Sequence, residues 1–138
     1  MSHIYLAAPL FSLAERNFNQ SLMDYLTERG LQVFSPYQEC DGLVGIDIYK
    51  TCLRGVSTAC ILVAILDGAD ADSGTCWECG YASAKGIPIV AVRTDFRSTG
   101  DTNGFNAMLY YSATVVVEGT DNLFARIFQA VEQLRHPS

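Results

Sequence analysis

The sequence predicts an α/β protein with a five-stranded parallel sheet flanked by helices. Short apolar runs, which are typical of buried strands, alternate along the chain with longer segments of helical periodicity. One run, residues 60–66, is apolar throughout, as expected of a central strand buried on both faces of a parallel sheet. The length of 138 residues matches the common size of one domain, so residues 1–138 are taken as a single domain.

The first half of the chain begins with a short apolar run at residues 4–7. From Phe11 onward, apolar residues recur every three or four positions, which predicts a helix that Gly30 ends as its C-cap. A second strand is expected at 31–34 and stops before Pro36. A strand, a helix and a second strand in this order imply parallel strands with a right-handed crossover.

The second half repeats this alternation. Helices are expected at 46–58, 73–85 and 121–134, and strands at 60–66, 87–92 and 114–117. Such an order predicts a flavodoxin-like or Rossmann-like topology, in which ligands bind beyond the carboxyl ends of the strands. Residues at those ends are therefore the first candidates for a functional site.

The net charge of the chain argues against some classes of partner. Nine Lys and Arg residues against fifteen Asp and Glu residues give a formal charge of −6, which repels phosphate backbones and anionic lipid. Apolar runs stay far below the roughly 20 residues that cross a bilayer. We therefore expect no nucleic acid polymer and no membrane as partners. The first five residues also lack the basic cluster of a secretory signal, so a cytoplasmic location is expected.

The sequence gives no sign of a cofactor. The loop at residues 7–11 has neither the GxGxxG pattern of dinucleotide binding nor the GKS/T of a P-loop. Cys76 and Cys79 form a CxxC pair, but neither a second pair nor a histidine cluster completes a zinc site. We interpret these thiols as helix-packing residues in a reducing compartment, and we expect no metal and no organic cofactor.

The densest polar segment, residues 67–78, leaves the central strand and enters the next helix. Helix capping by Asp72 or Ser73 explains part of this segment. Capping does not explain Glu78, which falls one turn inside the helix, where Ala or Leu would pack better. A carboxylate near a helix N-terminus is expected to have a low pKa and to stay ionised, which suits a nucleophile that attacks an anomeric carbon.

Three segments lie in the same order and spacing as in a known family over nearly the whole chain. They are IYLAAPLF at 4–11, DSGTCWECGYA at 72–82 and FNAML at 105–109. Together they resemble the nucleoside 2-deoxyribosyltransferase family. The resemblance implies a five-stranded α/β domain and a homo-oligomer with shared active sites. It also implies an enzyme of nucleoside salvage that exchanges the base of 2′-deoxynucleosides for a free nucleobase, through a covalent deoxyribosyl-glutamate intermediate and without a cofactor.

The resemblance assigns catalytic residues by motif position. Glu78 resembles the family's nucleophile, Asp72 the carboxylate that binds the deoxyribose hydroxyl, and Tyr5 the tyrosine that orients the nucleophile. Asn106 resembles the asparagine that reaches the sugar from a neighbouring subunit. Without the resemblance, Tyr5 fits a buried core tyrosine, and Asn106 fits the cap of a short turn at 107–110.

Substrate contacts are assigned in the same way. Phe11 resembles an aromatic wall for the base, Gln38 a base-contacting glutamine, and Met108 a neighbour of the asparagine. Phe11 also fits the first core residue of its helix, and Gln38, in a polar loop, also fits ordinary surface. Trp77 is interpreted as a packing or oligomer contact, and the charged residues 93–97 as a segment that shapes its loop.

One position departs from the family pattern. Several members carry an Asp on the helix before the central strand, assigned to protonate the leaving base, and Cys52 stands in that place here. A thiol is a poor acid for a purine nitrogen, although Asp47 or Asp41 could substitute. Two other interpretations therefore stay open: a nucleoside or nucleotide N-glycosidase on the same scaffold, and a non-catalytic nucleoside-binding domain.

Overall fold

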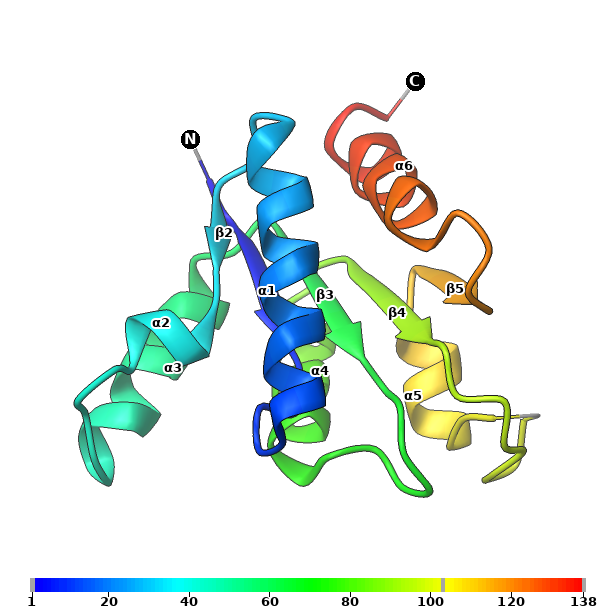
Figure 1. Ribbon diagram of the computed structural model, residues 1–138, viewed down its shortest axis with the longest axis horizontal. Coiled ribbons are helices and arrows are strands. Elements are labelled where there is room, and N and C mark those ends of the chain that lie inside the picture. The colour runs from blue at the N-terminus through cyan, green and yellow to red at the C-terminus, as the bar shows by residue number, and fades with distance from the viewer. Residues whose placement is uncertain (1, 103, 138) are drawn as a thin grey trace.

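The computed structural model describes residues 2–102 and 104–137. Strands and helices alternate along the chain, as Figure 1 shows. Their order is β1 (Ile4–Ala7), α1 (Leu13–Glu28), β2 (Val33–Phe34), α2 (Pro36–Glu39), α3 (Ile46–Ser57), β3 (Ile61–Ile65), α4 (Ser73–Ala84), β4 (Ile89–Arg93), α5 (Ala107–Ser112), β5 (Val115–Glu118) and α6 (Leu123–Arg135).

The strands form one sheet in the order β2-β1-β3-β4-β5, and all neighbouring strands are parallel. The predicted fold class, a five-stranded parallel sheet flanked by helices, is confirmed. The chain moves outward in one direction from β1 to β2 and in the other direction from β3 to β5. The strand order therefore reverses between β1 and β3, and a crevice for a ligand is expected beyond their carboxyl ends.

The core lies on both faces of the sheet because side chains alternate along each strand. On β1, Ile4 and Leu6 pack in a cluster with α1 and α6, whereas Tyr5 and Ala7 pack in a second cluster with α3 and α4. Strand β3 is buried at every position, as expected for the centre of the sheet. Figure 1 shows α1 in front of the sheet and α4 behind it. Tyr5 therefore faces the layer that contains α4.

The C-terminal end of α1 was predicted correctly, and its N-terminal end was not. Gly30 follows the helix at φ 88°, a left-handed conformation that glycine adopts without strain, so it ends α1 as predicted. The predicted start at Phe11 is wrong, because the helix begins at Leu13. Ser12 caps it by accepting a hydrogen bond from the Glu15 N–H (3.1 Å), while Glu15 accepts one from the Ser12 N–H (2.7 Å).

Short elements were the hardest to predict. The expected polar loop around Gln38 is instead α2, which begins with Pro36, a residue favoured at the first position of a helix. The turn expected at 107–110 is a helix of six residues, α5. The strand expected at 31–34 pairs only over Val33–Phe34. Within the described residues, no helix is long and apolar enough to cross a membrane.

Candidate active site

Tyr5 and Glu78 form a hydrogen-bonded pair between the sheet and α4. Tyr5 is completely buried on β1, and its ring stacks on Phe34, with the ring centroids 5.2 Å apart. Its hydroxyl donates a hydrogen bond to Glu78 Oε2. Glu78 is half-buried in the second turn of α4. Because the tyrosine ring is held in the core, its hydroxyl fixes the position of one oxygen of the carboxylate.

The charge state of Glu78 differs from the sequence-based expectation of a low pKa. Burial raises the pKa of Glu78 to about 7, the nearby Asp72 charge adds to this increase, and the Tyr5 hydrogen bond opposes it. The expectation was wrong because the helix macrodipole acts mainly within the first turn, and Glu78 lies beyond it. Burial and the Glu78 charge hold the pKa of Tyr5 far above its ordinary range, so Tyr5 stays a hydrogen-bond donor.

Asp72 caps the N-terminus of α4, one of the two caps that the sequence suggested. Its Oδ2 accepts hydrogen bonds from the Thr75 N–H (3.0 Å) and the Thr75 hydroxyl (3.1 Å). Asp72 is nevertheless half-exposed, and it lines the same cavity as Glu78. Capping therefore anchors this carboxylate at the edge of the cavity.

The cavity that contains Glu78 has a volume of about 410 Å³, within the range of small-molecule sites. Its wall comes from the loop after β1, from α2 and α3, and from the start of α4: Ala8, Phe11, Pro36, Ile48, Tyr49, Cys52, Asp72, Gly74, Trp77 and Glu78. The charged residues in this lining are Asp72 and Glu78. The rest is mainly apolar and aromatic, which suits a flat heterocyclic ligand.

Three aromatic residues decide the character of this wall. Phe11 precedes the helix and is 78% exposed, so its interpretation as a core residue is wrong. Trp77 stacks on Tyr81 with centroids 5.5 Å apart, which agrees with its interpretation as a packing residue, and it also lines the cavity. Tyr49 contacts the Trp77 ring edge-on at 6.1 Å. The sequence analysis missed Tyr49, although it lies three residues before Cys52 and thus on the same helix face.

Cys52 also lines the cavity, and its Sγ lies 3.6 Å from the Cys40 Sγ. Burial raises the pKa of Cys40 to about 12. The carboxylates suggested as substitutes for an acid at position 52, Asp41 and Asp47, are both exposed, and the described lining of the cavity includes neither. At the place where an acid for the leaving base is expected, the cavity therefore has the Cys52 thiol and neither of these carboxylates.

Three of the predicted site residues lie elsewhere in this chain. Asn106 caps α5, since its Oδ1 accepts a hydrogen bond from the Met108 N–H (2.8 Å). Asn106 and Met108 line another cavity, of about 570 Å³, between α4 and α5. Gln38 is exposed on α2, and its amide donates to Gln20 Oε1 at 3.4 Å. A contact of Asn106 with a neighbouring subunit, and one of Gln38 with a base, both stay predictions.

The two cavities differ in chemistry. The larger one, between α4 and α5, is lined by small and apolar residues together with Asp70 and Asn106. The smaller one is lined by Glu78, a carboxylate with a strongly raised pKa that accepts a hydrogen bond from the buried Tyr5. Because such perturbed groups concentrate at functional sites, we assign the smaller cavity as the candidate active site.

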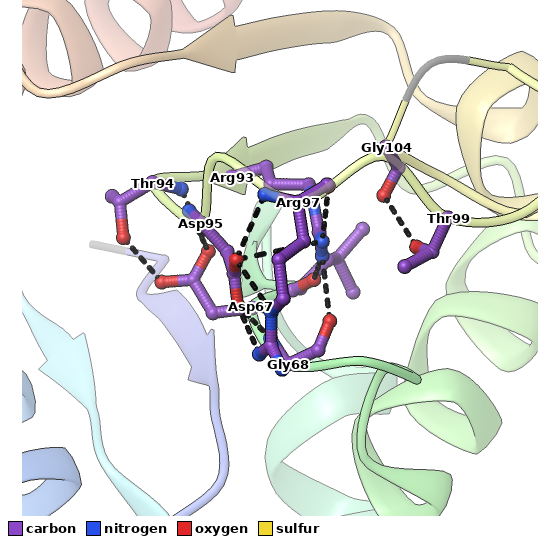
Figure 2. Close-up of polar contacts among 9 residues, drawn as sticks. Asp67, Gly68, Arg93, Thr94, Asp95, Arg97, Thr99 and Gly104 are labelled. Atoms are coloured by element: carbon purple, nitrogen blue, oxygen red, sulfur yellow. Dashed lines mark hydrogen bonds and ion pairs between the residues drawn. The ribbon is translucent and has the colours of Figure 1, made fainter.

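A polar network holds together the loops after β3 and β4 (Figure 2). The buried Arg93 donates hydrogen bonds to the carbonyl oxygens of Leu66 (2.7 Å) and Gly68 (3.1 Å). Asp67 accepts hydrogen bonds from the N–H (2.6 Å) and the hydroxyl (2.5 Å) of Thr94. This network fixes the start of the segment that leads to Asp72.

The remaining charged residues of the 93–97 loop pair with each other. Arg97 binds Asp95 at 2.5 Å, and this hydrogen bond holds the pKa of Asp95 well below its usual range. Both residues line a third cavity, of about 350 Å³, beside Glu15. The interpretation of this segment as loop-shaping agrees with these contacts.

A metal site is not apparent among residues 2–102 and 104–137, where no three His, Cys, Asp or Glu side chains are grouped to hold an ion. The candidate site combines the Tyr5–Glu78 pair, the Asp72 carboxylate, the Cys52 thiol and an aromatic wall.

Comparison with known families identifies the chain's relatives. The family model for nucleoside 2-deoxyribosyltransferase matches residues 4–122. The chain belongs to this family. No curated protein matches it significantly.

Solved structures of similar fold support the same assignment. A 2-deoxyribosyltransferase from Bacillus psychrosaccharolyticus is 25% identical, with a TM-score of 0.74 over 92% of this chain and 90% of that one. A 2-deoxyribosyltransferase from Leishmania mexicana is 20% identical, with a TM-score of 0.74 over all of both chains. A CMP N-glycosidase from Clostridium botulinum is 21% identical, with a TM-score of 0.64 over 95% of this chain and 99% of that one. At 20% and 21% identity, the last two structures show similarity of fold alone.

Proposed function

We propose that this protein transfers 2-deoxyribose between nucleobases, with Glu78 as the nucleophile. The observation that carries the proposal is Glu78 on the wall of an aromatic cavity, held in place by a hydrogen bond from the buried Tyr5. A carboxylate held in one orientation beside a sugar is the group that glycoside-cleaving enzymes use to form a covalent glycosyl intermediate.

The reaction runs in two displacements. A Glu78 oxygen forms a bond to C1′ of the donor nucleoside, the C1′–N bond breaks, and its electron pair leaves with the base. A nitrogen of a second base then attacks C1′, and the bond to Glu78 breaks, which restores the carboxylate. The proton that the second base loses balances the proton that the departed base gains. Each displacement inverts C1′, so the product keeps the configuration of the donor.

The residues around Glu78 have roles that their positions suit. Tyr5 orients Glu78 and lowers its pKa against the effect of burial. Asp72, anchored by Thr75, is placed to bind the deoxyribose hydroxyl. Phe11, together with Trp77, offers ring surface against which the base can stack.

Assembly and cellular role form part of the same proposal. Met108 is 78% exposed beside Asn106, as expected for residues that contact a second copy of the chain. We infer a homo-oligomer in which Asn106 reaches the sugar bound by a neighbour. The corresponding role is nucleoside salvage in the cytoplasm, with 2′-deoxynucleosides and free nucleobases as the substrates.

Chromatography of a 2′-deoxynucleoside incubated with the protein, with and without a different free base, tests this function. A new nucleoside that appears only with the second base, and not with Glu78→Ala, is the expected result. Release of base and deoxyribose regardless of the second base would instead make the protein a hydrolase. Binding without turnover would make it a nucleoside-binding domain.

A hydrolase is the second candidate because of Cys52, which stands where an acid for the leaving base is expected. Among the described residues, the cavity lining contains no Lys, Arg or His that would bind a 5′-phosphate. A hydrolase acting at this site would therefore take nucleosides in preference to nucleotides.

A further inference from the structure

The charge of the cavity favours a positively charged ligand. Its charged groups, within the part of the chain that the structure describes, are the carboxylates of Asp72 and Glu78. The surrounding wall is apolar and aromatic, which weakens screening by water and strengthens attraction between opposite charges. Aromatic ring faces such as those of Trp77 and Tyr49 also attract cations directly.

The proton donors in the cavity are weak acids. Cys52 offers a thiol and Tyr49 a phenolic hydroxyl, and neither group protonates a leaving nitrogen as readily as a carboxylic acid does. The Tyr5 hydroxyl is already bonded to Glu78. Asp72 accepts two hydrogen bonds from Thr75, an arrangement that suits an acceptor. Glu78 itself must be ionised to attack C1′.

We propose that the preferred donors of this site are 2′-deoxyribosides whose base carries a positive charge, such as an N-alkylated purine or a pyridinium. This inference rests on the proposed function, because it concerns the base that leaves when Glu78 attacks C1′. The two carboxylates attract the cationic base, and the weak acids of the cavity are then sufficient because the base needs no proton.

The leaving step balances without an acid. As the Glu78 oxygen bonds to C1′, the C1′–N bond breaks and its electron pair moves onto the ring nitrogen. In a cationic base, this electron pair cancels the positive charge, so the base departs as a neutral molecule. A neutral purine would depart as an anion unless a general acid donated a proton to it.

The state of Glu78 agrees with a cationic donor. Its pKa is raised to about 7 by burial, so an empty cavity holds much of it in the protonated form at neutral pH. A positive charge in the cavity lowers that pKa and increases the fraction of ionised nucleophile. Binding of such a donor therefore activates the attacking group.

The test compares 2′-deoxyadenosine with its N7-methyl derivative, which differs by one methyl group and a positive charge. The rate of base release by the protein is measured for both and divided by the rate of spontaneous hydrolysis of each compound. We expect the methylated donor to be accelerated at least as strongly as the neutral one, because the carboxylates attract its charge and its base leaves without a proton. A general acid would accelerate the neutral donor by about 10²–10⁴-fold more than the methylated one.

A pair of variants at position 52 supplies the control. Cys52→Asp introduces an acid, and Cys52→Asn has nearly the same shape without the acidity. We expect Cys52→Asp to increase the rate for 2′-deoxyadenosine at least tenfold relative to Cys52→Asn, with less than a twofold difference for the methylated donor. Circular dichroism of both variants checks that they fold.

Two results overturn the inference, and they differ in what else they affect. A wild-type acceleration of 2′-deoxyadenosine about 100-fold greater than that of the methylated donor would show that an acid acts on neutral bases. The transferase function would then stand without the cation preference. If neither donor loses its base in a Glu78-dependent reaction, the proposed function fails and the inference fails with it. The ratio of the two accelerations by the wild-type protein tests the cation preference even if a variant does not fold.

Discussion

Replacing Tyr5 by Phe removes the hydroxyl that donates to Glu78 Oε2 and leaves the ring that stacks on Phe34. A hydrogen bond to a charged group is worth about 1.5–3 kcal/mol, and one pKa unit corresponds to about 1.4 kcal/mol. The hydrogen bond stabilises the ionised carboxylate, so its loss raises the pKa of Glu78 by roughly one to two units from about 7.

The ionised carboxylate is the nucleophile, so Tyr5→Phe loses activity at neutral pH and regains it at high pH. We expect a loss of about 5- to 50-fold at pH 7 and a loss of only a few fold above about pH 9. The assay is the dependence of kcat/KM on pH for base release from 2′-deoxyadenosine. The acidic limb of the wild-type profile should have its midpoint near pH 7, and that of the variant about one to two units higher.

Tyr25→Phe is the matched control, because Tyr25 packs against Phe124 on the opposite face of the sheet. This variant should keep the wild-type midpoint. If Tyr5→Phe lowers the rate equally at every pH and leaves the midpoint in place, the hydroxyl does not act through the charge of Glu78, and the reasoning is refuted.

Three further predictions concern stability and assembly. The pKa of Glu78 rises on folding from 4.5 to about 7, so the folded protein loses stability as the pH rises through this range. In urea denaturation at pH 8, Glu78→Gln should therefore be more stable than the wild type by up to about 3 kcal/mol. Below pH 4 the two proteins should not differ. Arg93→Met leaves buried carbonyl oxygens without a donor and should lower the free energy of unfolding by about 2–4 kcal/mol. Arg97→Ala, at an exposed ion pair, should change the free energy of unfolding by less than about 1 kcal/mol. Equal effects of the two variants would contradict the role given to Arg93. Inactive Glu78→Ala and Asn106→Ala chains, mixed and allowed to exchange subunits, should regain activity in hybrid oligomers, and a complete lack of activity would count against a shared site.

The long elements of the fold could be predicted because periodicity and glycine punctuation are local signals. The run at 60–66 identified the central strand, and Gly30 identified the end of α1. Elements of two to six residues, such as β2 and α2, contain too few residues for a periodic pattern. The start of α1 was placed two residues early, because an apolar Phe11 matches the helical pattern although Ser12 caps the helix.

The candidate site was predictable in part. Motif positions singled out Tyr5, Asp72 and Glu78; the structure places Asp72 and Glu78 on the wall of one cavity and joins the buried Tyr5 to Glu78 by a hydrogen bond. The raised pKa of Glu78 depends on how deeply α4 buries it, and sequence spacing does not contain this information. Tyr49 joins the wall only because α3 packs against α4, a contact that neither helix encodes alone.

The central claim is that Glu78 becomes covalently bound to deoxyribose, and trapping of that intermediate tests it most directly. The protein is incubated with a 2′-deoxynucleoside in the absence of a second base, quenched, digested and examined by mass spectrometry. The account predicts one deoxyribosyl group on the peptide that contains Glu78, and its loss when a free base is added before quenching. Base exchange that proceeds with the group on another residue, or with no group on the chain, would contradict it.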